Sequence, residues 1–156
     1  MLDLRKLIID VFDPQKGENV IILNDFPSND DLVDDDYMHR REMVEQWHDA
    51  FSALGRDIGF TVEPILVYEP TGAHGKPLPE KGMQDGKAIN IDQKLKTLGA
   101  KDIVCPITRF SATGPIDGYL LKQKFRMASM PGAHMGMTAF QADYKVVAKK
   151  SKVLAK

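Results

Sequence analysis

The stretch Asn19-Val-Ile-Ile-Leu-Asn24 decides the fold class of this chain. It is short, continuously apolar and rich in β-branched residues. Continuous rather than alternating apolarity is typical of a strand buried on both faces, and such strands occur in parallel sheets that helices cover on both sides. The segment therefore predicts a parallel strand inside an α/β domain.

Helical patterns flank this strand on both sides. An opening helix is indicated by Leu4, Leu7, Ile8 and Val11, which repeat at helical spacing and stop at Asp13-Pro14. After the strand, the acidic stretch 29–36 precedes a second helix, and its carboxylates can cap the free N–H groups there. The apolar stripe of that helix consists of Tyr37, Val44, Trp47, Phe51, Leu54 and Ile58.

The rest of the chain continues the alternation of strands and helices. Helices are expected over 90–98, over 115–124 and from Phe140 to the end, and strands near 20–23, 62–68, 103–108 and 126–130. Pro64 lacks an N–H donor, so the second strand is an edge strand or starts later. We expect a three-layer α/β fold with a parallel sheet of about four strands and helices on both faces. The segment 69–88, with four glycines and three prolines, predicts a long loop.

The composition and length limit the classes of protein to which this chain can belong. The 156 residues, 43% hydrophobic and 28% charged, predict a single domain over 1–156. No apolar run approaches the roughly 20 residues that span a bilayer, and charges near the start do not fit a signal peptide. The lone Cys105 excludes an internal disulfide and a cysteine-based zinc site within one chain. These features predict a cytoplasmic protein without a membrane partner, whose thiol simply packs.

Charge is distributed unevenly along the chain. Residues 1–78 carry 7 Lys and Arg against 16 Asp and Glu, whereas residues 79–156 carry 14 against 6. Binding of nucleic acid requires basic residues interleaved with aromatic ones on one face, but the lysines here are scattered except near the C-terminus. We interpret the C-terminal lysines as a solvated helix face and expect no nucleic-acid partner.

In an open parallel sheet the ligand crevice lies beyond the carboxyl ends of the strands. There the segment Thr108-Arg-Phe-Ser-Ala-Thr-Gly-Pro115 combines hydroxyls, a guanidinium and a helix N-terminus, which suit a carboxylate or phosphate. Arg109, Ser111 and Thr113 are therefore the candidate substrate-binding residues. The alternative is that Ser111 or Thr113 caps the following helix and that Arg109 is an ordinary surface residue.

Other candidate motifs in the sequence do not match known phosphate-binding, metal-binding or catalytic patterns. The Gly-Lys pair at 75–76 lacks the glycine and the Ser or Thr of a phosphate-binding P-loop. His39 and His48 are nine residues apart, on opposite sides of a helix, and no histidine pair has metal-ligand spacing. No catalytic triad can be assembled. The residues themselves therefore predict no catalytic group, no metal ligand and no cofactor in this chain.

Three segments nevertheless carry a resemblance to a known family. Arg126-Met-Ala-Ser-Met-Pro-Gly132, the preceding Thr108-Arg-Phe-Ser-Ala-Thr113 and the following Thr138-Ala-Phe-Gln-Ala-Asp-Tyr144 resemble the aminopeptidase T family of leucyl aminopeptidases. The opening Val11-Phe-Asp-Pro-Gln-Lys-Gly-Glu-Asn-Val-Ile-Ile22 is similar to the family's first helix, turn and strand. The resemblance covers most of this chain but only the N-terminal part of a family member.

The resemblance implies a cytoplasmic, commonly dimeric metallopeptidase that removes N-terminal residues at a two-metal site. It implies metal ligands in a C-terminal domain that these residues do not include, so no ligand position is carried over. The acidic 29–36 stretch and the 69–88 segment depart from the family pattern. The resemblance extends to ring-cleaving dihydroxypyridine dioxygenases, which share the architecture and use one iron.

A second hypothesis is a non-catalytic α/β module that binds a ligand or a partner. Candidate partners are a peptide, a small molecule and a second copy of the chain. Because the C-terminal stripe of Phe140, Tyr144, Val147 and Leu154 extends past a domain of four strands, we expect Val147 and Leu154 to be partly exposed or to pack in a homodimer.

Overall fold

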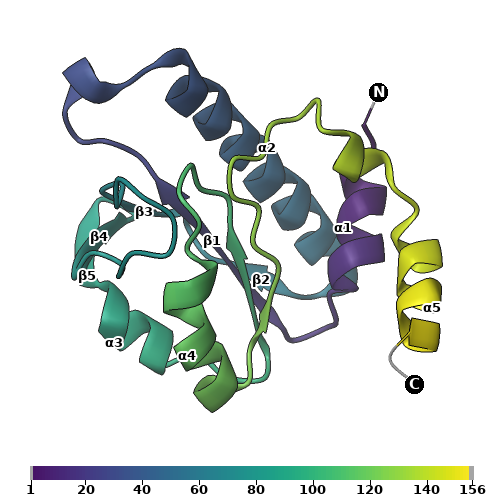
Figure 1. The fold of residues 1–156 in the computed structure, drawn as a ribbon. Helices are drawn as coiled ribbons and strands as arrows, with labels where there is room; N and C mark the ends of the chain where they lie inside the picture. The colour runs from purple at the N-terminus through teal and green to yellow at the C-terminus, as the bar shows by residue number, and fades with distance from the viewer. Residues whose placement is uncertain (1, 155–156) are drawn as a thin grey trace.

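The computed structural model describes residues 2–154. They form an α/β fold with a seven-strand, mixed and mostly parallel sheet (Figure 1). The strands are β1 (Asn19–Asp25), β2 (Thr61–Val62), β3 (Leu66–Tyr68), β4 (Lys81–Gln84), β5 (Lys87–Asn90), β6 (Asp102–Pro106) and β7 (Arg126–Met127). Their order across the sheet is β5-β4-β3-β1-β6-β7, and β2 also pairs with β1.

Five α-helices occur in the described part of the chain. They are α1 (Leu4–Phe12), α2 (Asp35–Ile58), α3 (Ile91–Lys96), α4 (Thr113–Gln123) and α5 (Tyr144–Leu154), with 3-10 turns at Asp30–Leu32 and Thr138–Gln141. Figure 1 shows α1 and α2 on one face of the sheet and α3 and α4 on the other. Among residues 2–154, no helix has both the length and the apolarity to cross a membrane.

The prediction of a central strand buried on both faces is confirmed. Val20 and Ile22 pack into the core under α1 and α2, whereas Ile21 and Leu23 pack into the core under α3 and α4. All four side chains are at most 1% exposed. β1 pairs in parallel with β2, β3 and β6, and β6 pairs in parallel with β7. The four predicted strands are therefore parallel, as expected.

The acidic stretch starts α2, also as expected. The side chain of Asp34 accepts a hydrogen bond from the amide of Tyr37 at 3.0 Å, and Asp35 and Asp36 lie in the first turn. Carboxylates at this position satisfy free N–H groups and complement the helix dipole. The helix ends at Gly59, whose φ of 94° lies in the left-handed region that glycine tolerates.

The predicted second strand is divided into two pieces. β2 and β3 lie on either side of Glu63 and Pro64, and both pair with β1. Because proline offers no N–H group, the sheet ladder stops there and resumes at Leu66.

The prediction of a loop over 69–88 is wrong for its second half, and the sheet is not purely parallel. β4 and β5 form an antiparallel hairpin, and β4 also pairs antiparallel with β3. The turn is Asp85-Gly86, with φ values of 50° and 72°. An Asp-Gly pair with two positive φ angles suits a two-residue hairpin. This hairpin adds two antiparallel strands to the strands predicted from the sequence.

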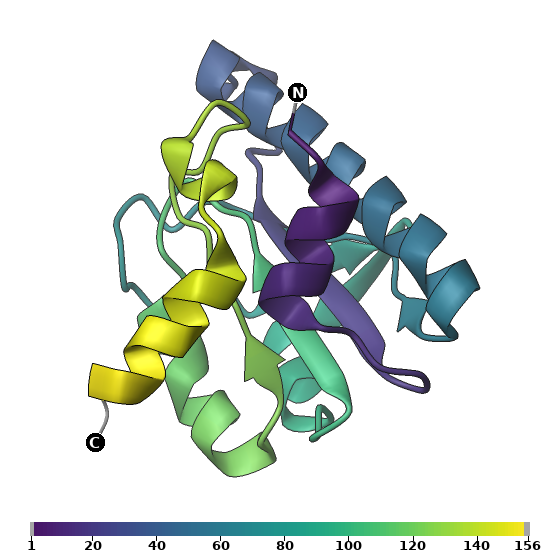
Figure 2. The same ribbon diagram turned by 90° about the vertical axis from the view of Figure 1, so that its right-hand side faces the viewer.

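The predicted helix from Phe140 to the end is also corrected. Phe140 belongs to a 3-10 turn, and α5 begins at Tyr144. Asp143 interrupts the pattern because its side chain accepts a hydrogen bond from the amide of Val146 at 3.1 Å and so starts a new helix. Figure 2 shows α5 beside α1. Val147 is 46% exposed, as expected, whereas the side chain of Leu154 lies outside the described residues.

Candidate functional site

A polar cluster lies at the carboxyl ends of β1 and β6. The chain leaves β1 through α2 toward β3 on one side, and β6 lies on the other side of β1. This is the point where the strand order reverses, the usual ligand position in open α/β sheets. β7 itself is short, but the chain after it continues along β6. The amides of Ala128, Met130 and Gly132 bond to the carbonyls of Val104, Pro106 and Thr108.

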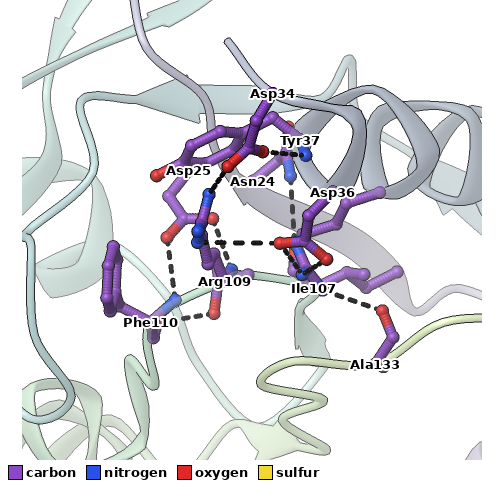
Figure 3. Close-up of polar contacts among 11 residues, drawn as sticks. Asn24, Asp25, Asp34, Asp36, Tyr37, Ile107, Arg109, Phe110 and Ala133 are labelled. Carbon is purple, nitrogen blue, oxygen red and sulfur yellow. Dashed lines mark hydrogen bonds and ion pairs between the residues drawn. The ribbon is translucent and has the colours of Figure 1, made fainter. Parts of the chain in front are cut away.

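Asp25, at the end of β1, holds the segment that follows β6. Its carboxylate accepts the backbone N–H groups of Arg109 at 2.6 Å and Phe110 at 3.0 Å (Figure 3). The residue is 1% exposed. Burial raises the pKa of Asp25, although the two backbone hydrogen bonds and the charge of Arg40 act in the opposite direction. The carboxylate of Asp25 therefore already accepts the hydrogen bonds of the two backbone amides that an external anion could otherwise use.

Arg109 faces the start of α2. Its guanidinium donates a hydrogen bond to Asp34 at 2.7 Å, lies 3.6 Å from a carboxylate oxygen of Asp36 and stacks 4.6 Å above the ring centre of Tyr37 (Figure 3). The hydrogen bond from Arg109 lowers the pKa of Asp34. The guanidinium thus ties the segment between β1 and α2 to the end of β6. About a third of the Arg109 side chain stays exposed.

Arg40 lies beneath this cluster and is 3% exposed. One terminal nitrogen of Arg40 donates to both carboxylate oxygens of Asp36, at 2.7 and 2.8 Å, and the other donates to the carbonyl of Ala133 at 2.8 Å. It therefore connects α2 with the loop after β7. The buried Nε of Arg40 and the buried hydroxyl of Ser129 have no hydrogen-bond partner among the described residues.

The other two predicted site residues lie at the start of α4. The hydroxyl of Ser111 donates to that of Thr113 at 3.2 Å, and the amide of Ser111 donates to His74 at 2.9 Å. The N-cap position of α4 is Ala112, but the hydroxyl of Ser111 also accepts the amide of Thr113, the first residue of this helix, at 3.4 Å. Ser111 therefore satisfies one of the free N–H groups at the helix start, as the capping alternative expected. The structure thus pairs Ser111 with Thr113 and directs Arg109 toward α2.

Several residues of the cluster were not selected from the sequence. Asp25 is the last residue of β1 and was recognisable by position. Its role, however, depends on hydrogen bonds from Arg109 and Phe110, which come 84 and 85 positions later in the chain. Arg40 is the only charged residue among the buried positions of α2, and that placement on the apolar face was a usable signal. Nothing in the sequence indicated that Arg109 would contact Asp34 and Tyr37.

Metal binding receives no support in the described residues. No group of three or more His, Cys, Asp or Glu side chains there is arranged to hold an ion. His48 instead contacts the carbonyl of Glu63 at 3.1 Å. The described residues thus offer no site for a divalent metal, whose ligands the resemblance implies in another domain.

Comparison of the chain with protein-family models, curated proteins and solved structures finds no match.

Proposed function

We propose that this chain is the N-terminal domain of a cytoplasmic, metal-dependent aminopeptidase of the aminopeptidase T kind, and that it forms one wall of the substrate site. The observation that carries the proposal is the meeting of the two most distinctive segments of the resemblance. Gly132, the last residue of the Ala-Ser-Met-Pro-Gly segment, donates its amide to the carbonyl of Thr108, the first residue of the Thr-Arg-Phe-Ser segment, at 2.8 Å. Both segments lie at the reversal of strand order, where substrates bind in such sheets.

In this proposal the domain binds and orients the substrate, and the metals belong to residues beyond Lys156. Asp25 fixes the backbone of Arg109 and Phe110, so that the guanidinium is held at a defined place. A partly exposed guanidinium can donate to a peptide carbonyl or carboxylate. The neighbouring hydroxyls of Ser111 and Thr113 add two further groups that can bond to a peptide backbone.

The test uses the product of the whole reading frame. Loaded with zinc, cobalt or manganese, it should hydrolyse leucyl-p-nitroanilide, whereas residues 1–156 alone should not. Arg109→Gln should raise KM in the active product, and Lys122→Gln, an exposed change on α4, should leave KM unchanged. A reading frame without downstream carboxylates and histidines, or a loaded product without hydrolysis, would overturn the proposal. Cleavage of a dihydroxypyridine with iron would instead identify the related dioxygenase.

A non-catalytic binding module is the second candidate. The observation that favours it is that Asp25 and Asp34, which position the partly exposed guanidinium of Arg109, both belong to this domain, so the candidate site needs no residue from elsewhere. A folded 156-residue product that binds a small molecule and has no longer reading frame would support this candidate.

A further inference from the structure

A separate cavity lies on the α2 face of the sheet. It has a volume of about 330 Å³, between α2 and the carboxyl ends of β1 and β3. This volume is at the small end of the roughly 300–1,000 Å³ typical of ligand sites, so it suits a molecule of metabolite size. The lining residues are Asn24, Phe26, Arg41, Val44, Glu45, Ile65 and Val67, which include none of the predicted site residues.

Asn24 provides a buried polar group in this cavity. It is 3% exposed and pairs directly with Val67 across the β1–β3 ladder. Its side-chain amide donates to the carbonyl of Ile107 at 3.0 Å, whereas its Oδ1 atom accepts no hydrogen bond from any described residue. Asn24 Oδ1 is not one of the fully buried side-chain atoms without a partner. It is therefore an acceptor that a molecule in the cavity can reach.

Opposite charges lie at the rim of the cavity. Arg41 stacks over the ring of Phe26, 5.3 Å from its centre, and its Nε donates to Glu45 at 3.3 Å. The two terminal nitrogens of Arg41 donate to no group within residues 2–154. The rim therefore offers an oriented guanidinium for an anion and a carboxylate for a cation.

We propose that this cavity binds a free α-amino acid with a branched aliphatic side chain. The side chain packs against Val44, Ile65 and Val67. The ammonium donates to Oδ1 of Asn24 and to Glu45, and the carboxylate accepts from the terminal nitrogens of Arg41. This site requires no residue beyond those described, so it stands or falls independently of the peptidase proposal.

Calorimetric titration of the 156-residue chain tests the assignment with three probes. L-Leucine has all the required groups, 4-methylpentanoate lacks the ammonium, and 3-methylbutylamine lacks the carboxylate. We expect one saturable site for L-leucine and at least about tenfold weaker binding of either analogue, a difference of about 1.4 kcal/mol. Equal binding of all three probes would show that the cavity recognises only the apolar side chain. Absence of binding would show that the cavity is not a ligand site. Either result overturns the proposal.

Variants identify the charges that are responsible. Arg41→Gln should weaken the binding of L-leucine and abolish its advantage over 3-methylbutylamine. Glu45→Gln should reduce its advantage over 4-methylpentanoate, because Asn24 still accepts from the ammonium. Arg56→Gln, on the same helix but outside the cavity, should change neither. Val67→Phe should fill the cavity and abolish binding while the circular dichroism spectrum stays unchanged. If that variant does not fold, Ile65→Phe replaces it. Unaltered affinity in Arg41→Gln would overturn the assignment.

Discussion

The carboxylate of Asp25 and the amide of Arg109 are 2.6 Å apart, although 84 positions separate them in the chain. This hydrogen bond joins the end of β1 to the segment after β6. Because the same carboxylate also accepts the amide of Phe110, the position of the Arg109 side chain depends on a residue outside its own segment. Substitution of Asp25 should therefore act on both stability and the candidate site.

Asp25→Ala should lower the free energy of unfolding by about 2–4 kcal/mol, because two backbone N–H groups lose a buried charged acceptor. Urea unfolding followed by circular dichroism measures this change. Asp117→Ala is the control, since this residue is exposed on α4 and should change stability by less than about 0.5 kcal/mol. Equal effects of the two variants would contradict the role assigned to Asp25.

The pH dependence of Asp25 has a definite sign. Since burial raises its folded pKa above the unfolded value of about 3.9, the folded state binds the proton more tightly. Its contribution to stability is thus fully present below the unfolded pKa and is lost as the pH rises through the folded pKa. The stability of wild type minus that of Asp25→Asn should fall from about pH 4 upward and then level off. Urea unfolding over a pH series measures this difference, and a difference that rises with pH would contradict the prediction.

Glu63 should show the opposite sign. Burial alone would raise its pKa, but hydrogen bonds from Lys94 at 2.6 and 2.8 Å and from Asn19 at 2.8 Å outweigh it, so the pKa is lowered. Its stabilising contribution is present above the unfolded pKa of about 4.3 and is lost as the pH falls through the folded pKa.

A double-mutant cycle tests this ion pair. Glu63→Gln and Lys94→Met should show a coupling energy of about 1–3 kcal/mol at pH 7, because hydrogen bonds to charged groups at partly buried positions are among the stronger ones. The coupling should shrink toward pH 3. Additive effects of the two substitutions at pH 7 would show that the pair contributes nothing.

Much of the fold was predictable because its signals are local. Apolar continuity identified β1, and the carboxylates of 29–36 identified the start of α2. The β4–β5 hairpin was missed although Asp85-Gly86 is a hairpin signal, because the glycines and prolines around it resemble a loop. The break before α5 was missed because the apolar spacing continues across it, while the capping by Asp143 depends on one side chain.

The candidate site was predictable in place but not in arrangement. The rule for strand ends placed Arg109, Ser111 and Thr113 beyond the carboxyl end of β6, and they lie there in the structure. Their partners come from other elements: Asp25 from β1, Asp34 from the start of α2 and His74 from the loop after β3. A single sequence carries no signal for such long-range pairs, since each partner alone is an ordinary polar residue.

The exposed side of α5 yields a prediction about association. Val146 and Val147 are 44% and 46% exposed, whereas Phe140 is 7% exposed and packs against Trp47. Replacing both valines with lysine should change the unfolding free energy by less than about 0.5 kcal/mol and lower the apparent mass in light scattering if this face associates. Phe140→Ala should instead cost about 3–5 kcal/mol. Unfolding of the double-lysine variant would show that the face belongs to the domain's own core.

Two helical glycines should respond oppositely to the same substitution. Alanine is ordinarily favoured over glycine inside a helix by about 1 kcal/mol. At Gly118 of α4, an added Cβ meets nothing within 4 Å, so Gly118→Ala should raise the midpoint of thermal unfolding. At Gly55 of α2, the Cβ would lie 2.7 Å from the backbone carbonyl oxygen of Phe60, which is fixed by the chain entering β2. Gly55→Ala should therefore cost about 1–3 kcal/mol despite the gain in helix propensity, and calorimetric melting of both variants measures the contrast. A stabilised Gly55→Ala would mean that the chain around Phe60 moves away from α2 at little cost, and that the close contact at the end of this helix does not constrain the fold.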